Sequence, residues 1–218
     1  MRSRRFLLAC GIGSLVAGGV IAFVLLGEAF SEDSSPTRIA IMVDAGHGGR
    51  DPGVVVDGIH EADVNLEIAR RVCVHLAEDP RVAVFMTRDE DISLSHEQRI
   101  AIATEKEASA YISIQANAFA SPSAHGIETW VDEDQHPGSA SWSLAEIIQG
   151  ALVSATGGRD RGVRSMGLYF GELSCPAVLV EVGFLTNPAE RQQLLTAEHQ
   201  ETVAASVARS ILSTLDFL

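Results

Sequence analysis

The stretch RIAIMVDAGHGGRDPG, residues 38–53, decides the fold of this chain. Its first half contains an uninterrupted apolar run, which is typical of a buried strand in a sheet covered by helices. Its second half places His47 among three glycines, Gly46, Gly48 and Gly49, directly after that strand. Ligands of open α/β sheets bind outside the carboxyl ends of the strands. His47 is therefore the first candidate functional residue.

Short apolar runs and amphipathic segments alternate along the rest of the chain. We expect strands at residues 38–43, 82–87, 111–114, 127–131, 167–170 and 177–182. We expect helices at residues 61–76, 95–107, 143–154 and 198–215. Strands separated by helices predict a mainly parallel sheet. The expected fold class is α/β, a single three-layer domain with a sheet of about six strands covered by helices.

The N-terminal segment differs from this domain. Residues 1–5 form a basic tip, and residues 6–26 are an uncharged run long enough to cross a hydrocarbon core of about 30 Å. The arginines before the run place the N-terminus in the cytoplasm and the rest outside. We expect a transmembrane anchor or uncleaved signal helix, and the alternative is secretion after cleavage behind Ala29. Residues 27–37 are interpreted as a linker and residues 38–218 as the exported domain.

Composition limits the partners of this domain. The chain has 16 basic and 29 acidic residues, a net charge of −13, which argues against nucleic-acid binding because no basic face is available. Lys106 is the sole lysine, so a phosphate-binding P-loop is excluded. Cys73 and Cys175 are interpreted as small buried apolar residues, with a disulfide as the alternative.

Polar residues follow two further strands and open one helix. Glu61 begins the first long helix, where a carboxylate also complements the helix dipole. Gln115 and Asn117 follow the strand at residues 111–114, and Glu181 ends an apolar strand. A carboxylate in that position is unfavourable unless it is protonated, paired with an arginine or bound to a metal. These residues predict a site at the carboxyl edge of the sheet.

Six sequence blocks resemble the zinc-dependent N-acetylmuramoyl-L-alanine amidases of the Amidase_3 type. They are residues 43–49, 60–66, 87–89, 99–101, 113–117 and 176–188, in the order of the family. The resemblance covers the whole exported domain. It implies an enzyme of the cell envelope that acts on peptidoglycan and hydrolyses the amide between N-acetylmuramic acid and the L-alanine of the stem peptide.

The resemblance also implies residue roles. His47 and Glu61 match two zinc ligands, Glu181 matches the catalytic carboxylate, and Asn117 is a candidate for substrate binding. Gln115 stands where the family has its third ligand, a histidine. A carboxamide offers zinc only a neutral, hard oxygen, so we expect zinc to bind weakly.

The substitution at Gln115 leaves several functions open. His125 or His60 is a candidate to replace the missing imidazole in an active, zinc-dependent amidase. The alternative is a catalytically impaired amidase-fold protein that binds murein or regulates another cell-wall hydrolase. A third is a domain that binds an unrelated small anion at the glycine-rich turn. About 45 residues separate Val131 from Ala177, too few for a long insertion over the site, so we expect an open groove.

Overall fold

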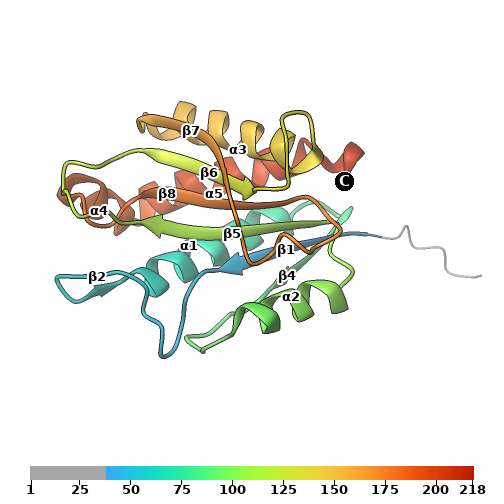
Figure 1. Ribbon diagram of the computed structural model, residues 1–218, viewed down its shortest axis with the longest axis horizontal. Helices are drawn as coiled ribbons and strands as arrows, with labels where there is room; N and C mark the ends of the chain where they lie inside the picture. The colour runs from blue at the N-terminus through green and yellow to red at the C-terminus, as the bar shows by residue number, and fades with distance from the viewer. Residues whose placement is uncertain (1–37) are drawn as a thin grey trace, which may run out of the picture. The chain divides into compact units, whose positions relative to one another are not determined.

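A six-stranded sheet runs through residues 38–218, the part of the chain that the computed structural model describes (Figure 1). The strand order is β4-β1-β5-β8-β6-β7. The strands are β1 (Ile39–Ala45), β4 (Val82–Met86), β5 (Ala110–Asn117), β6 (Ile127–Asp132), β7 (Asp160–Met166) and β8 (Ala177–Phe184). All neighbours are parallel except β6 and β8, which are antiparallel. The prediction of a mainly parallel sheet of about six strands is confirmed.

Helices lie on both faces of this sheet. They are α1 (Glu61–Leu76), α2 (His96–Glu105), α3 (Ala140–Thr156), α4 (Pro188–Leu194) and α5 (Ala197–Leu212), followed by a 3-10 turn, Leu215–Phe217. The apolar stripes of α1, α3 and α5 bury the first face, on residues such as Ile41 and Ile112. Helix α2 packs on the second face against Met42 and Tyr111. The three-layer prediction is confirmed.

The second face is covered unevenly. Helix α2 lies at the β4 side of the sheet (Figure 1) and packs through Ala103 on Met42 of β1, with Phe85 of β4 against the same cluster. Helix α3 packs on β6 and β7 and belongs to the core of the first face. Among residues 38–218, no helix therefore covers the second face of β6 and β7. Cα partners on neighbouring strands carry side chains on the same face. Gln115, Glu181 and Glu128 are partners in this sense, so they form a row across the second face.

The strand predicted at residues 167–170 is wrong. That stretch forms turns between β7 and β8, and β7 itself is the polar segment Asp160–Met166. β7 is an edge strand whose residues are mostly half-buried or exposed, so it needs no apolar run. Leu168, Tyr169 and Phe170 are apolar because they pack on the second face. The short helix α4 and the hairpin of β2 (Val55–Val56) and β3 (Ile59–His60) were not predicted.

Two further predictions concern the N-terminus and the cysteines. The anchor expected at residues 6–26 lies outside the described residues, and within residues 38–218 no helix has the length and apolarity to cross a membrane. Cys73 and Cys175 are both free, so the disulfide alternative is wrong. Burial raises the pKa of the Cys73 thiol to about 12, as expected for a packing residue.

Candidate active site

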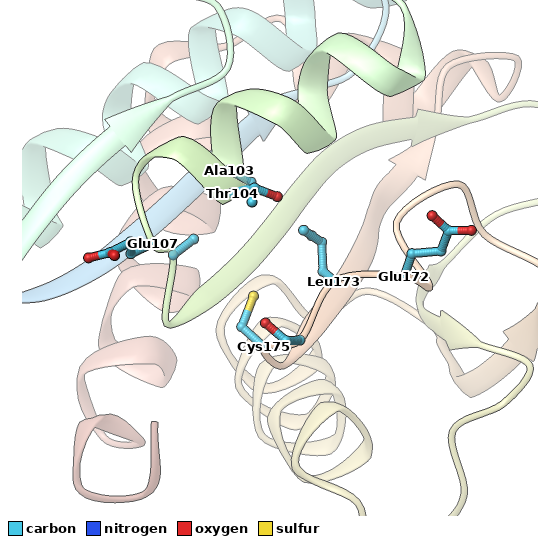
Figure 2. Close-up of a pocket in the computed structure, with 8 residues that line it drawn as sticks. Ala103, Thr104, Glu107, Glu172, Leu173 and Cys175 are labelled. Carbon is cyan, nitrogen blue, oxygen red and sulfur yellow. The ribbon is translucent and has the colours of Figure 1, made fainter.

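A pocket of about 400 Å³ opens on the second face of the sheet, at the carboxyl ends of β1, β5 and β8. Its lining is His47, His96, Gln115, Asn117, Trp130, Met166, Leu168, Tyr169, Leu179 and Glu181. The structure therefore brings His47, Gln115, Asn117 and Glu181 to one cavity. A larger hollow near Cys175, shown in Figure 2, lies at the amino ends of β5 and β8 and contains none of these residues.

His47 is presented by a sharp turn in which both it and the following glycine have positive φ angles. The His47 backbone has φ 61° and Gly48 has φ 125°, so the chain reverses sharply after β1. A Cβ atom on Gly46 would lie 2.0 Å from Nε2 of Gln115, so the glycine makes room for that side chain. The turn thus sets the imidazole beside Gln115.

His47 lies between two carboxylates. Its Nδ1 is 2.8 Å from Oδ2 of Asp51, and its Nε2 is 3.4 Å from Oε1 of Glu61. Contact with Glu61 raises the pKa of His47 to about 9, with a further contribution from Asp51, although burial opposes the rise.

Glu61 is fixed as the buried first residue of α1. Its Oε2 accepts a hydrogen bond from the Val54 N–H at 3.0 Å, and its Oε1 accepts one from the Ala116 N–H at 3.2 Å. Burial raises the pKa of Glu61, but His47 and these backbone donors outweigh it, so the pKa lies below 4.5. Glu61 is therefore an ionised carboxylate that joins the helix to two loops.

Asn65 connects Glu61 to Gln115. Its Nδ2 donates to Oε1 of Glu61 at 3.2 Å and to Oε1 of Gln115 at 3.3 Å. Nε2 of the Gln115 carboxamide donates a hydrogen bond to Ser113 Oγ at 3.3 Å. Sequence reasoning missed Asn65, although a polar residue one helical turn after Glu61, inside a buried stripe, was a usable signal.

Glu181 has a different environment from Glu61. Its Oε2 is buried and has no hydrogen-bond partner among the described residues. Burial raises the pKa of Glu181 well above 4.5, and the charges of Glu61 and Glu128 raise it further, against an opposing effect of His47. The alternative of an arginine partner for Glu181 is wrong within residues 38–218, since the nearby arginines pair with Glu128.

Asn117 is held by a third buried acid. Its Nδ2 donates to Oε1 of Glu128 at 2.5 Å, and its Oδ1 accepts from the Ala118 N–H at 2.7 Å. Asn117 lines the pocket, but its side chain already has partners in the pocket wall. Its role in substrate binding stays a prediction.

The opposite wall is formed by two stacked rings. The His96 and Tyr169 rings stack with centroids 4.1 Å apart. The Tyr169 hydroxyl donates to Oδ2 of the buried Asp44 at 2.8 Å. His96 is an exposed residue of α2, and its ring meets the pocket only because the turn that carries Tyr169 lies against it, which the sequence alone does not reveal.

Two buried arginines hold the glycine-rich turn from below. Nη2 of Arg99 donates to the His47 carbonyl at 2.6 Å, and Nη2 of Arg88 donates to the Gly46 carbonyl at 2.8 Å. Arg99 also pairs with Asp44 at 2.5 Å. Burial raises the pKa of Asp44, but Arg99 and the hydroxyl donors around it outweigh burial and bring it below 3.8.

Neither histidine suggested as a replacement ligand reaches this cluster. His125 is exposed in a loop, where its Nδ1 lies 2.9 Å from the Ser123 carbonyl. His60 is exposed before α1, with its nearest carboxylate partner, Asp63, at 3.9 Å. Within residues 38–218, no group of three or more histidine, cysteine, aspartate or glutamate side chains is arranged to hold a metal.

Residues 41–213 match the model of the family Amidase_3, described as N-acetylmuramoyl-L-alanine amidase. The chain belongs to this family. A germination-specific N-acetylmuramoyl-L-alanine amidase of Bacillus subtilis (strain 168) is 32% identical to this Amidase_3 chain, over 91% of the chain and 92% of the relative. The N-acetylmuramoyl-L-alanine amidase LytC of the same strain is 36% identical over 77% of the chain, but that match covers only 34% of LytC.

Solved structures agree with this membership. The crystal structure of an N-acetylmuramoyl-L-alanine amidase from Clostridium difficile 630 superposes with a TM-score of 0.79 and 32% identity, covering 84% of the Amidase_3 chain and 99% of that structure. The resemblance inferred from the six sequence blocks is confirmed. The antiparallel junction of β6 and β8 and the pocket belong to the part of the chain that these matches cover.

Proposed function

We propose that this Amidase_3 chain is a peptidoglycan amidase that hydrolyses the amide between N-acetylmuramic acid and the L-alanine of the stem peptide. Family membership and relatives that carry the amidase name support this activity. The observation that carries it is the shared pocket: Glu181, His47 and Gln115 line one cavity, with Glu61 directly behind His47. The alternative of a catalytically impaired protein gains no support from the relatives.

Zinc is typical of this family, and the donors present fit it incompletely. His47 and Glu61 converge, which gives one imidazole and one carboxylate. Asn65 holds the Gln115 carboxamide beside the same Glu61 oxygen, so a neutral oxygen takes the place of a second imidazole. We propose these three side chains as the residues that would hold zinc, with low affinity.

When bound, zinc supplies a Lewis acid that polarises the scissile carbonyl and acidifies a water molecule. The proton transfers are assigned to Glu181. Its carboxylate takes a proton from the attacking water as the carbon–oxygen bond forms, and returns it to the amide nitrogen as the carbon–nitrogen bond breaks. The raised pKa of Glu181 suits the proton abstraction, because its carboxylate is a stronger base than that of an ordinary glutamate.

The proposed substrate also bears on location. Peptidoglycan lies outside the cytoplasm, so the domain has to be exported to reach it. We propose a cell-envelope protein, with residues 6–26 as the anchor or signal helix that sequence analysis expects. This segment lies outside the described residues.

The test is hydrolysis of purified sacculi by the purified protein in the presence of zinc. We expect new L-alanine amino termini to appear without new reducing sugars. Glu181→Gln is expected to lower the rate by about 10²–10⁴-fold, the usual contribution of a general base. Glu172→Gln is the matched control, because Glu172 is exposed at the hollow of Figure 2. Reducing ends without amino termini, or equal losses in both variants, would contradict the proposal.

A further inference from the structure

The pocket continues along the uncovered face of β6 and β7. Trp130 and Met166 line it, and Met166 is 47% exposed although it is apolar. Arg164 is the Cα partner of Trp130 and shares its face of the sheet. Its guanidinium carbon lies 5.6 Å from the centre of the Trp130 ring. An aromatic ring, a thioether chain and a cation thus form one strip beside the catalytic cluster.

The position of Arg164 is fixed by a buried anchor. The Glu128 side chain is only 3% exposed, and its two oxygens lie 3.0 Å from Nε of Arg164 and 3.4 Å from Nε of Arg161. Asn117 donates to the same carboxylate. Stacking on Trp130 restricts the guanidinium further. Arg164 is therefore held in place, while 44% of its side chain remains exposed.

The charges of this cluster do not cancel. Two guanidinium groups share the Glu128 carboxylate, so these three side chains carry one net positive charge. The next carboxylate on this face, Asp132, accepts hydrogen bonds from the backbone N–H groups of Asp134 and Leu168. Within residues 38–218, the hydrogen bonds and ion pairs of Arg164 all use Nε, so both Nη groups have donors to offer. A guanidinium with free Nη groups is suited to a carboxylate.

An anionic ligand needs such a cation here. The chain carries a net charge of −13, and Glu61, Glu128 and Glu181 all lie at or behind the pocket. A ligand carboxylate that enters the groove meets a negative field unless a cation offsets it. Arg88 and Arg99 are buried below the turn and bonded to its carbonyl oxygens, so Arg164 is the better-placed cation.

The register sets how far the cation lies from the reacting bond. Arg164 is two strands away from Glu181 and two residues further along. With strands about 4.8 Å apart and a rise of about 3.3 Å per residue, the two Cα atoms are roughly 12 Å apart. An extended peptide covers about 3.5 Å per residue. The Arg164 guanidinium lies over Trp130, on the strand nearer to Glu181, so the gap from the guanidinium to the reacting bond is shorter than the distance between the Cα atoms. A peptide that starts at the scissile bond therefore brings its second or third residue to this guanidinium.

We propose that Arg164 binds a carboxylate carried by the second residue of the stem peptide, on the leaving-amine side of the scissile bond. Trp130 and Met166 are the surface on which that part of the peptide lies. The proposal rests on the proposed function and adds a preference for anionic stem peptides to it.

The test uses N-acetylmuramoyl-L-alanyl peptides whose second residue is glutamic acid, its α-amide or its diamide, so that it carries two, one or no carboxylates. We expect the wild-type protein to show a KM about tenfold lower for the diacid than for the diamide, the scale of one charge-assisted hydrogen-bonded pair. The monoamide shows which carboxylate matters. Arg164→Gln is expected to remove this difference by raising the KM for the diacid, and Arg164→Lys is expected to restore part of it.

Arg161→Gln is the matched control. The Arg161→Gln substitution also removes one positive charge and one ion pair with Glu128. The Arg161 guanidinium, however, lies over the Phe184 ring and not over Trp130. We expect this variant to weaken the preference for the diacid less than Arg164→Gln does, because the Nη donors of Arg164 remain in place beside Trp130. Equal KM values in the wild-type protein, equal losses of preference in both variants, or a uniform fall in kcat for Arg164→Gln would overturn the proposal.

A binding measurement separates this proposal from the proposed function. The free dipeptides L-alanyl-D-glutamic acid and its diamide are titrated while tryptophan fluorescence is recorded. Tighter binding of the diacid that Arg164→Gln abolishes supports the subsite even if no peptide or sacculus is hydrolysed. Hydrolysis without any such preference in binding or KM overturns the subsite and leaves the amidase activity in place.

Discussion

Replacing Gln115 by histidine is expected to raise the zinc affinity of this protein. The change supplies the second imidazole beside His47 and Glu61, and Gly46, with no Cβ, leaves space for the ring. Complete four-ligand zinc sites bind with about 10–16 kcal/mol, so one ligand accounts for roughly 3 kcal/mol. A neutral oxygen supplies a small part of that. The net gain is about 2–3 kcal/mol, or roughly 30- to 150-fold in dissociation constant.

The measurement is a competition titration against a chromogenic zinc chelator, with cobalt absorption as a second readout of ligand number. Gln115→Ala is the companion variant, and it is expected to bind zinc more weakly than the wild-type protein if the carboxamide oxygen is a ligand. A wild-type protein that retains one zinc per chain against a strong chelator, or a Gln115→His variant with an unchanged dissociation constant, would contradict this prediction.

Three further predictions concern the support of the site. Arg99→Met is expected to lower the free energy of unfolding in urea by about 3–5 kcal/mol, because it leaves Asp44 charged and buried without its partner. A carboxyl whose pKa is lower in the folded than in the unfolded chain stabilises the fold above its unfolded pKa. The stability that Asp44 contributes above pH 3.8 is therefore lost as the pH falls toward its lower folded pKa. Acid unfolding of the Asp44→Asn variant is expected to lack this loss of stability. Gly46→Ala is expected to displace Gln115 and lower the free energy of unfolding by about 1–3 kcal/mol. Gly150→Ala, which has free space around its new Cβ in α3, is expected to raise the free energy of unfolding by about 0.5–1 kcal/mol. Melting temperatures of the two variants that shift in the same direction would contradict this prediction.

Much of the fold could be predicted because local pattern and tertiary burial agree. Helix α1 matches its predicted bounds, since its apolar stripe is the one that packs on the sheet. The capping motif Ser95-x-x-Gln98 marks the start of α2, and both of its hydrogen bonds are present. β7 was not predicted because its sequence lacks an apolar run. It is an edge strand that is held by backbone pairing with β6, and its side chains are mostly polar and half-buried or exposed.

The site was predictable only where it follows strand ends. His47 could be found because it follows the buried strand β1, and Glu181 because it is a carboxylate inside an apolar run, although β8 continues past it to Phe184 instead of ending there. Trp130 and Arg164 depend on the pairing register of β6 with β7 and β8, which no single segment reveals. Asn65 depends on which face of α1 meets the turn after β1, and its hydrogen bonds join residues 19 and 50 positions away.

The bare second face of β6 and β7 has a consequence for how a polymer is approached. Among residues 38–218, no helix roofs the trough that runs from Glu181 past Trp130. A meshwork of cross-linked strands has few loose ends to thread into a tunnel. A trough that is open along its side can bind a glycan strand sideways, at any point along the strand. Hydrolysis can therefore begin in the middle of a cross-linked layer and does not need a free strand end.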